Sequence, residues 1–153
     1  MIYTDLKGDT APRDFAGAVE SLHYTDDSGR NDIVSVSVSN DDKNLYILIE
    51  CADEITPYSE ECWLNILLRT GGAEYVLNEQ GQGVLQGSTS RVVCENVLQG
   101  NRIWVKIPFA CMPERGESCA LRVTDNVGEG VLSIYAQGDS APLGNLFYEY
   151  KFA

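Results

Sequence analysis

The chain has 153 residues, of which 44% are hydrophobic and 22% charged, so the composition predicts a folded domain rather than a disordered chain. Eleven lysines and arginines against 23 aspartates and glutamates give a net charge of −12. Such an acidic surface repels phosphate backbones and anionic lipids, which argues against nucleic-acid and membrane partners. It is compatible with neutral sugars and with hard cations such as calcium, although solubility alone also explains it.

The five cysteines include no C-x-x-C pair, and there is a single histidine, His23, which argues against a zinc site. Most of the cysteines adjoin apolar strand residues, where a reduced thiol packs as a small core side chain. The alternative is a Cys51–Cys62 or Cys111–Cys119 bridge, which requires an oxidising compartment.

No stretch approaches the roughly 18 apolar residues of a membrane span, and the N-terminus lacks the pattern of a signal peptide. We expect one domain over residues 1–153, either a complete small protein or a piece cut from a longer one. In the second case the location is extracellular or at the cell surface if the longer protein is secreted.

In chain order, the N-terminal segment reads as polar and irregular, with an edge strand over residues 17–24 and a dense turn over 25–32. Valine and serine alternate strictly over residues 34–39, which predicts a half-buried strand. A hairpin loop is expected at residues 40–44. The almost continuous apolar run over residues 45–51 predicts a return strand at a central position in its sheet.

Residues 63–69 have two different faces when they are read with period two. The first face is wholly apolar and predicts a strand packed on the core: Leu64, Ile66 and Leu68. The second face combines an aromatic ring, an amide and a guanidinium: Trp63, Asn65, Leu67 and Arg69. This second face is our first candidate for binding something small and polar.

Further short strands are expected over residues 74–78, 83–85, 91–94, 101–107, 120–124, 132–136 and 147–151. One helical turn is expected at residues 109–112, and no segment sustains a 3.6-residue period. Short strands at near-regular spacing are typical of an antiparallel sandwich or barrel. Of these two we predict the sandwich: an all-β antiparallel β-sandwich, jelly-roll or immunoglobulin-like, with little helix.

Six fragments of the chain together resemble a known family: residues 28–33, Asp41 with 44–46, 63–65, 101–108, 124–126, and 138–144 followed by Tyr148 and Tyr150. They are similar to the family 9 carbohydrate-binding modules and the wider DOMON-like sandwiches. These are bacterial domains, often attached to glycoside hydrolases or other cell-surface polysaccharide proteins. The resemblance spans about residues 5–150, and it implies a β-sandwich, a concave sugar-binding face with a stacking tryptophan, and often a structural calcium.

Trp63 matches the stacking tryptophan of that family, and neighbouring polar groups on the same or the next strand are expected to take the sugar hydroxyls. The predicted ligand-binding set is Trp63, Asn65, Arg69, Tyr75, Asn78, Glu79 and Trp104. Trp104 lies on the polar side of its own strand and is expected to be a second ring. The alternative is that either tryptophan packs under a loop.

Acidic turns are the candidate calcium ligands, because calcium prefers carboxylate and carbonyl oxygens. The predicted set is Asp32, Asp125, Asn126 and Asp139, of which the last three match turns of the family that the chain resembles. None of them follows the EF-hand spacing. The alternative is that these side chains bond their own backbone in Asx-turns.

Catalysis is not predicted, because His23 has no nucleophile motif around it and Gly-x-Ser-x-Gly is absent. The predicted function is a non-catalytic accessory module that binds an oligo- or polysaccharide on an aromatic platform. Two alternatives stay open: a structural or protein-interaction sandwich that has lost sugar binding, and a small hydrolase that uses facing carboxylates.

Overall fold

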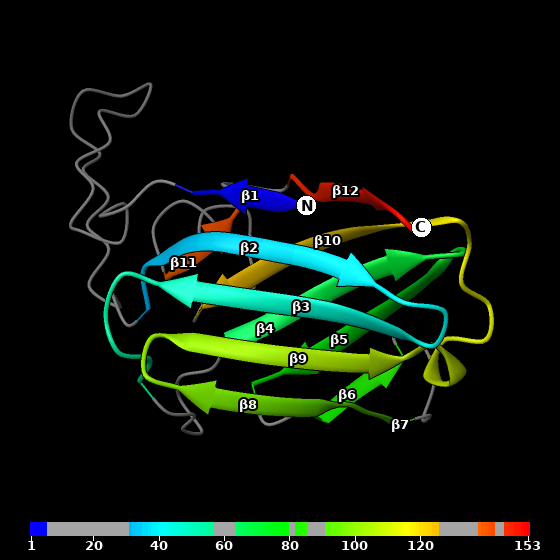
Figure 1. Cartoon of the computed structure of the whole chain (residues 1–153), viewed down its shortest axis with the longest axis horizontal. Coiled ribbons are helices and arrows are strands. Elements are labelled where there is room, and N and C mark those ends of the chain that lie inside the picture. Colours follow the sequence, from blue (N-terminus) through cyan, green and yellow to red (C-terminus); the bar gives the residue numbers. More distant parts are fainter. Residues whose placement is uncertain (6–30, 57–63, 80–81, 86–90, 126–137, 143–145) are drawn as a thin grey trace, which may run out of the picture.

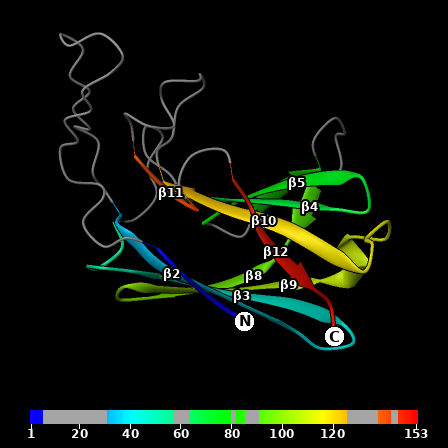
Figure 2. The same ribbon diagram turned by 90° about the horizontal axis from the view of Figure 1, so that it is seen from above.

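The computed structural model describes residues 1–5, 31–56, 64–79, 82–85, 91–125, 138–142 and 146–153. Their strands pair into two antiparallel sheets (Figure 1). Figure 2 shows the sheets as two stacked layers, with β2, β3 and β9 in one and β4, β5 and β10 in the other. The prediction of an all-β antiparallel sandwich is confirmed.

The first sheet has five strands in the order β1-β2-β3-β9-β8. Their bounds are β1 Ile2–Thr4, β2 Ile33–Asn40, β3 Asn44–Cys51, β9 Arg102–Pro108 and β8 Glu95–Gln99. The central position predicted for residues 45–51 is confirmed, because β3 lies between β2 and β9.

The second sheet has the order β11-β10-β4-β5-β6-β7, and β12 also pairs with β10. The strand bounds are β4 Leu64–Thr70, β5 Ala73–Asn78, β6 Gln82–Leu85, β7 Arg91–Val93, β10 Ser118–Asp125, β11 Asp139–Ala141 and β12 Tyr148–Lys151. A short 3-10 helix, η1 Phe109–Cys111, lies where one helical turn was predicted. No helix in the described ranges is long and apolar enough to cross a membrane.

The core lies between the sheets and is built by the alternation of the strands. On β3 every second residue is buried, and on β4 the predicted apolar face is at most 2% exposed: Leu64, Ile66 and Leu68. Burying one such side chain stabilises the fold by about 1.5–3 kcal/mol. Because β-strands alternate, these inward positions also decide which side chains point to solvent.

Three strands escape the sequence prediction because each is too short, too exposed or too buried to show a readable alternation. β1 has three residues, and β8 is exposed at four of its five positions because it is a sheet edge. β11 is a buried polar segment, Asp139 to Ala141, where a turn was expected. The strands predicted over residues 17–24 and 132–136 lie outside the described residues, as do most of the turn at 25–32.

Three cysteines of the described part of the chain are buried free thiols: Cys51, Cys94 and Cys119. The expectation of reduced core thiols therefore holds for these three, Cys111 is only half-buried, and Cys62 lies outside the described residues. Burial raises the pKa of the Cys119 thiol to about 12. Burial, with nearby carboxylates, does the same for Cys51.

We expect thiol labelling of the folded protein at pH 8 to separate these cysteines. At that pH a thiol of pKa about 12 is ionised in roughly one molecule in ten thousand, and only the thiolate is reactive. Cys51 and Cys119 should resist iodoacetamide in peptide mapping by mass spectrometry, whereas the half-buried Cys111 should react. Equal labelling of Cys51 and Cys111 in folded protein would contradict this packing.

Candidate functional site

Two of the predicted ligand-binding residues meet on the outer face of the second sheet. Asn65 on β4 lies directly opposite Asn78 on β5, and both are half-buried. Thr124 on β10 flanks Asn65 from the other side and is 6% exposed. A cluster of amide and hydroxyl groups therefore surrounds the start of β4, which is the end nearest to Trp63 in sequence. Trp63 itself lies outside the described residues.

Arg69 shares that face but lies at the other end of β4, about 13 Å along the strand from Asn65. Its guanidinium forms an ion pair with Glu74 on β5 and lies 4.2 Å from the centre of the Phe147 ring. Its side chain is 55% exposed, so the ion pair contributes little to stability. Arg69 and Asn65 are thus too far apart to hold one monosaccharide together.

Glu79 connects the start of β4 to the end of β5. Its backbone N–H donates to the Leu64 carbonyl at 3.0 Å, and its carboxylate accepts from the Leu64 N–H at 3.0 Å. Asn96 on the other sheet donates to the Glu79 carbonyl. Glu79 therefore holds in place the residue that follows Trp63.

The remaining two predicted ligand-binding residues lie elsewhere. Tyr75 is 2% exposed and belongs to the core, because alternation along β5 points it inward with Leu77. Trp104 is on β9 of the first sheet, on the face that points away from the core. The structure therefore brings together Asn65 and Asn78, and separates Tyr75 and Trp104 from them.

Two of the acidic residues predicted to bind calcium, Asp125 and Asp139, connect the two sheets by hydrogen bonds. Asp125 at the end of β10 is fully buried, and its two carboxylate oxygens accept from the backbone N–H and the side-chain amide of Asn31, at 3.2 and 2.9 Å. Asp139 on β11 accepts from the backbone N–H of Ile33 at 2.6 Å and of Ser140 at 2.8 Å. We call this set, Asn31, Asp125 and Asp139, the inter-sheet clasp.

Two described members of the predicted calcium set, Asp125 and Asp139, fit the ion poorly. All four carboxylate oxygens of Asp125 and Asp139 already accept N–H donors. Asp32 accepts the Ala52 N–H through its backbone carbonyl at 2.8 Å. No group of three or more metal-binding side chains occurs among the described residues. Asn126 lies outside them, so the calcium site stays a prediction.

The outer face of the first sheet carries a regular grid of side chains, set by the strand register. One row crosses all five strands and is mostly apolar: Ile2, Ser37, Leu48, Trp104 and Val97. The next row is polar and aromatic: Ser39, Tyr46, Lys106 and Glu95. Lys106 and Glu95 form an ion pair at 3.2 Å.

A groove of about 530 Å³ lies along these two rows, and residues of all five strands line it. The indole of Trp104 is 38% exposed in this groove, where Leu48 and Val97 are its cross-strand neighbours. Tyr46 is held at the polar side by its hydroxyl, which donates to Asp41 at 2.7 Å. This bond, with further N–H donors, lowers the pKa of the Asp41 carboxyl to about 2. Asp41 therefore connects the hairpin tip to Tyr46 beside the groove.

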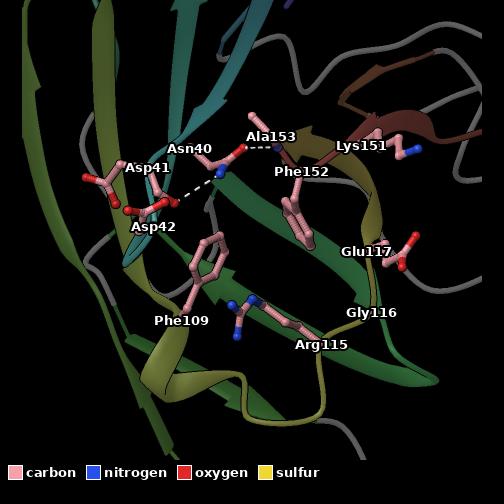
Figure 3. Close-up of a pocket in the computed structure, with 10 residues that line it drawn as sticks. All are labelled: Asn40, Asp41, Asp42, Phe109, Arg115, Gly116, Glu117, Lys151, Phe152 and Ala153. Carbon is pink, nitrogen blue, oxygen red and sulfur yellow. Dashed lines mark hydrogen bonds between the residues drawn. The ribbon is translucent and has the colours of Figure 1, made fainter.

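A second hollow, of about 590 Å³, lies between the β2–β3 hairpin and the C-terminal residues (Figure 3). Phe109 and Phe152 pack edge to face in it, and the Arg115 guanidinium lies 4.1 Å from the Phe109 ring centre. The Asn40 side-chain oxygen accepts from the Tyr150 hydroxyl and the Ala153 N–H. The groups around this hollow mainly contact one another, so we interpret it as packing between the hairpin and the C-terminal residues.

Comparison with solved structures gives a match to a family 9 carbohydrate-binding module from Caldicellulosiruptor kristjanssonii in complex with glucose. The identity is 18%, the alignment covers 78% of this chain and 75% of that one, and the TM-score is 0.44. This is the family that the sequence fragments resemble. No family model and no curated protein matches the chain.

The inter-sheet clasp predicts a loss of stability for Asp125→Asn. Both Asp125 oxygens accept hydrogen bonds, so an amide would turn its NH₂ toward one of the two Asn31 donors. Losing one buried, charge-assisted bond costs about 1–3 kcal/mol. Thermal denaturation should show a midpoint lowered by several degrees, while Asp42→Asn at the exposed hairpin tip should leave it unchanged. Equal midpoints for Asp125→Asn and the wild type would contradict the clasp.

Calcium binding has a direct test in the same assay. An ion that binds only the folded state raises the melting midpoint with its concentration. The calcium prediction expects a lower midpoint after chelation, restored by added calcium and not by magnesium. Identical midpoints with chelator and with millimolar calcium would reject a stabilising ion.

Proposed function

We propose that the protein is a non-catalytic carbohydrate-binding module and that Trp104 is its aromatic platform. The observation that carries the proposal is the exposed indole of Trp104 in a groove with an apolar row on one side and a polar row on the other. A sugar ring has an apolar C–H face and a rim of hydroxyls, so it needs both kinds of surface at once.

The polar row supplies the groups that sugar hydroxyls require. Ser39 is exposed beside Tyr46, and Lys106 and Glu95 offer a donor and an acceptor. The Leu48 and Val97 side chains widen the apolar surface on both sides of the indole. A ring stacked on Trp104 would therefore have its edge within reach of the polar row.

The family resemblance suggests a different position, at Trp63 with Asn65 and Asn78 on the second sheet. Asn65 and Asn78 lie on the outer face of the second sheet and Trp104 on the outer face of the first, so one sugar cannot contact both sets. We favour Trp104 because its exposed ring lies between Leu48 and Val97 in a groove that also has a polar row, and we treat Trp63 as a competing location. Attachment to a glycoside hydrolase, or to another polysaccharide-processing protein, belongs to the same proposal.

A non-catalytic role agrees with how the acids of the Trp104 face are used. Glu95 pairs with Lys106, and Glu50 pairs with Arg102 at 2.8 Å. A glycosidase instead holds two carboxylates about 5–10 Å apart on either side of the scissile bond. Glu95 and Glu50 thus each lie beside a cation.

A protein-docking face is the second candidate, favoured by the exposed aliphatic side chains at the ends of the apolar row. Ile2 is 71% exposed and Val97 is 59% exposed. Apolar patches of this kind often mark protein contacts. This candidate predicts self-association or no response to sugars, whereas the proposed function predicts saturable sugar binding.

Replacing Trp104 by alanine tests the proposed function. Because the ring provides most of the stacking area, Trp104→Ala should weaken the affinity for a neutral oligosaccharide about tenfold or more. Isothermal titration calorimetry measures the loss. Leu98→Ala is the matched control. Leu98 on β8 is an apolar residue that is 47% exposed, as Trp104 is exposed on β9, but its side chain points to the opposite face of the sheet from Val97 and Trp104.

Three outcomes of these binding measurements are informative. Loss of binding in Trp104→Ala with normal binding in Leu98→Ala supports the platform. Loss in Trp63→Ala alone keeps the function but moves the site to the second sheet. A folded wild-type protein that binds no member of a broad glycan array would overturn the function itself.

A further inference from the structure

We propose that the Trp104 groove binds the interior of a linear, uncharged polysaccharide that lies across the five strands, so that several consecutive sugars contact the row from Ile2 to Val97. This inference rests on the proposed function and names its ligand class. It follows from three properties of the groove: its length, its ends and its charge.

The length follows from the strand register. Ile2, Ser37, Leu48, Trp104 and Val97 are direct cross-strand neighbours, one from each strand. Neighbouring strands lie about 4.8 Å apart, so four intervals extend the row to about 19 Å. A single sugar over the indole would leave most of this row uncovered. An extended chain of several sugars would cover it.

The ends of the row lie at the two edges of the sheet. Ile2 belongs to the edge strand β1 and Val97 to the edge strand β8, and both side chains are more than half exposed. In the described ranges, then, the lining continues to both edges instead of ending at a wall. A site that recognises a chain end needs such a wall, whereas a site for the chain interior needs two open ends.

The charge of the groove selects against anionic sugars. Lys106 is the only lysine or arginine among the described lining residues, and it already pairs with Glu95. The chain as a whole carries a net charge of −12. A polyuronate would therefore approach an acidic protein whose groove offers it little charge, because Lys106 pairs with Glu95 and the N-terminal ammonium of Met1 already donates to the Val38 carbonyl. Neutral sugars with apolar ring faces and hydroxyl rims match the two rows.

The size and the polar border of the apolar row favour a glycan over a polypeptide in this groove. A stable protein interface buries about 800 Å² on each partner, while the apolar row is a single side chain wide and about 19 Å long. The row is bordered on one side by Ser39, Tyr46, Lys106 and Glu95, which would be dehydrated under a protein. Sugar hydroxyls can instead bond to them.

The test is a chain-length series measured by calorimetry, from the monosaccharide to the hexasaccharide of neutral β-1,4-linked glucose and mannose. Affinity should rise with each added sugar and level off once the oligosaccharide spans the row. Ile2 lies three strand intervals, about 14 Å, from Trp104. Ile2→Ser should therefore weaken hexasaccharide binding about fivefold and leave disaccharide binding unchanged.

Leu98→Ser, on the other face of β8, is the matched control and should change neither affinity. Trp104-dependent binding that is equally strong for monosaccharide and hexasaccharide would overturn this inference and keep the proposed function. Equal binding of an oligouronate would overturn the charge argument. No binding to any sugar, together with self-association in sedimentation, would overturn both proposals and favour protein docking.

Discussion

The whole architecture depends on the packing of two apolar sheet faces against each other. On β3 this packing turns Leu45, Ile47 and Ile49 inward, and each is at most 1% exposed. Because side chains alternate along a strand, Tyr46 and Leu48 then point to the solvent side. The surface that we propose for ligand binding is therefore the outer face of strands whose inner face forms the core. The strand register sets its rows.

The inter-sheet clasp adds a polar constraint to this apolar one. Asn31 and Ile33 at the start of the first sheet donate to Asp125 and Asp139 at one end of the second. Buried carboxylates are tolerated here because each oxygen has an N–H donor. Asp125 and Asp139, which were predicted to bind calcium, thus have a structural role. The Asx-turn alternative expected bonds to nearby backbone, and of these four bonds only the one from the Ser140 N–H to Asp139 is of that kind. Their hydrogen-bond donors include residues about a hundred positions away.

Alternation made much of the fold predictable, and its absence explains what was missed. The valine–serine pattern of β2 and the two faces of β4 could be read directly, as could the outward position of Trp104. The same rule places Tyr75 inward with Leu77, so its inclusion among the ligand-binding residues came from strand proximity rather than from period. β8 and β11 have no alternation to read, because β8 is exposed at four of its five positions and β11 is buried at all three.

The candidate site was less predictable than the fold, because it depends on register. The row that joins Ile2 to Val97 is assembled from five strands, two of which the sequence does not reveal. Asn31 and Glu79 likewise gain their roles only through partners on other strands. Local patterns can place a residue on a face, but they cannot say which residues of other strands will lie beside it.

The central claim is that a neutral glycan lies on the Trp104 row, and chemical-shift mapping by NMR tests it most directly. Titration with a neutral oligosaccharide should move the Trp104 indole N–H and the backbone amides of Leu48 and Val97 together, with one saturation curve. Shifts confined to the second sheet around Asn65 and Asn78, with the Trp104 indole unmoved, would contradict it.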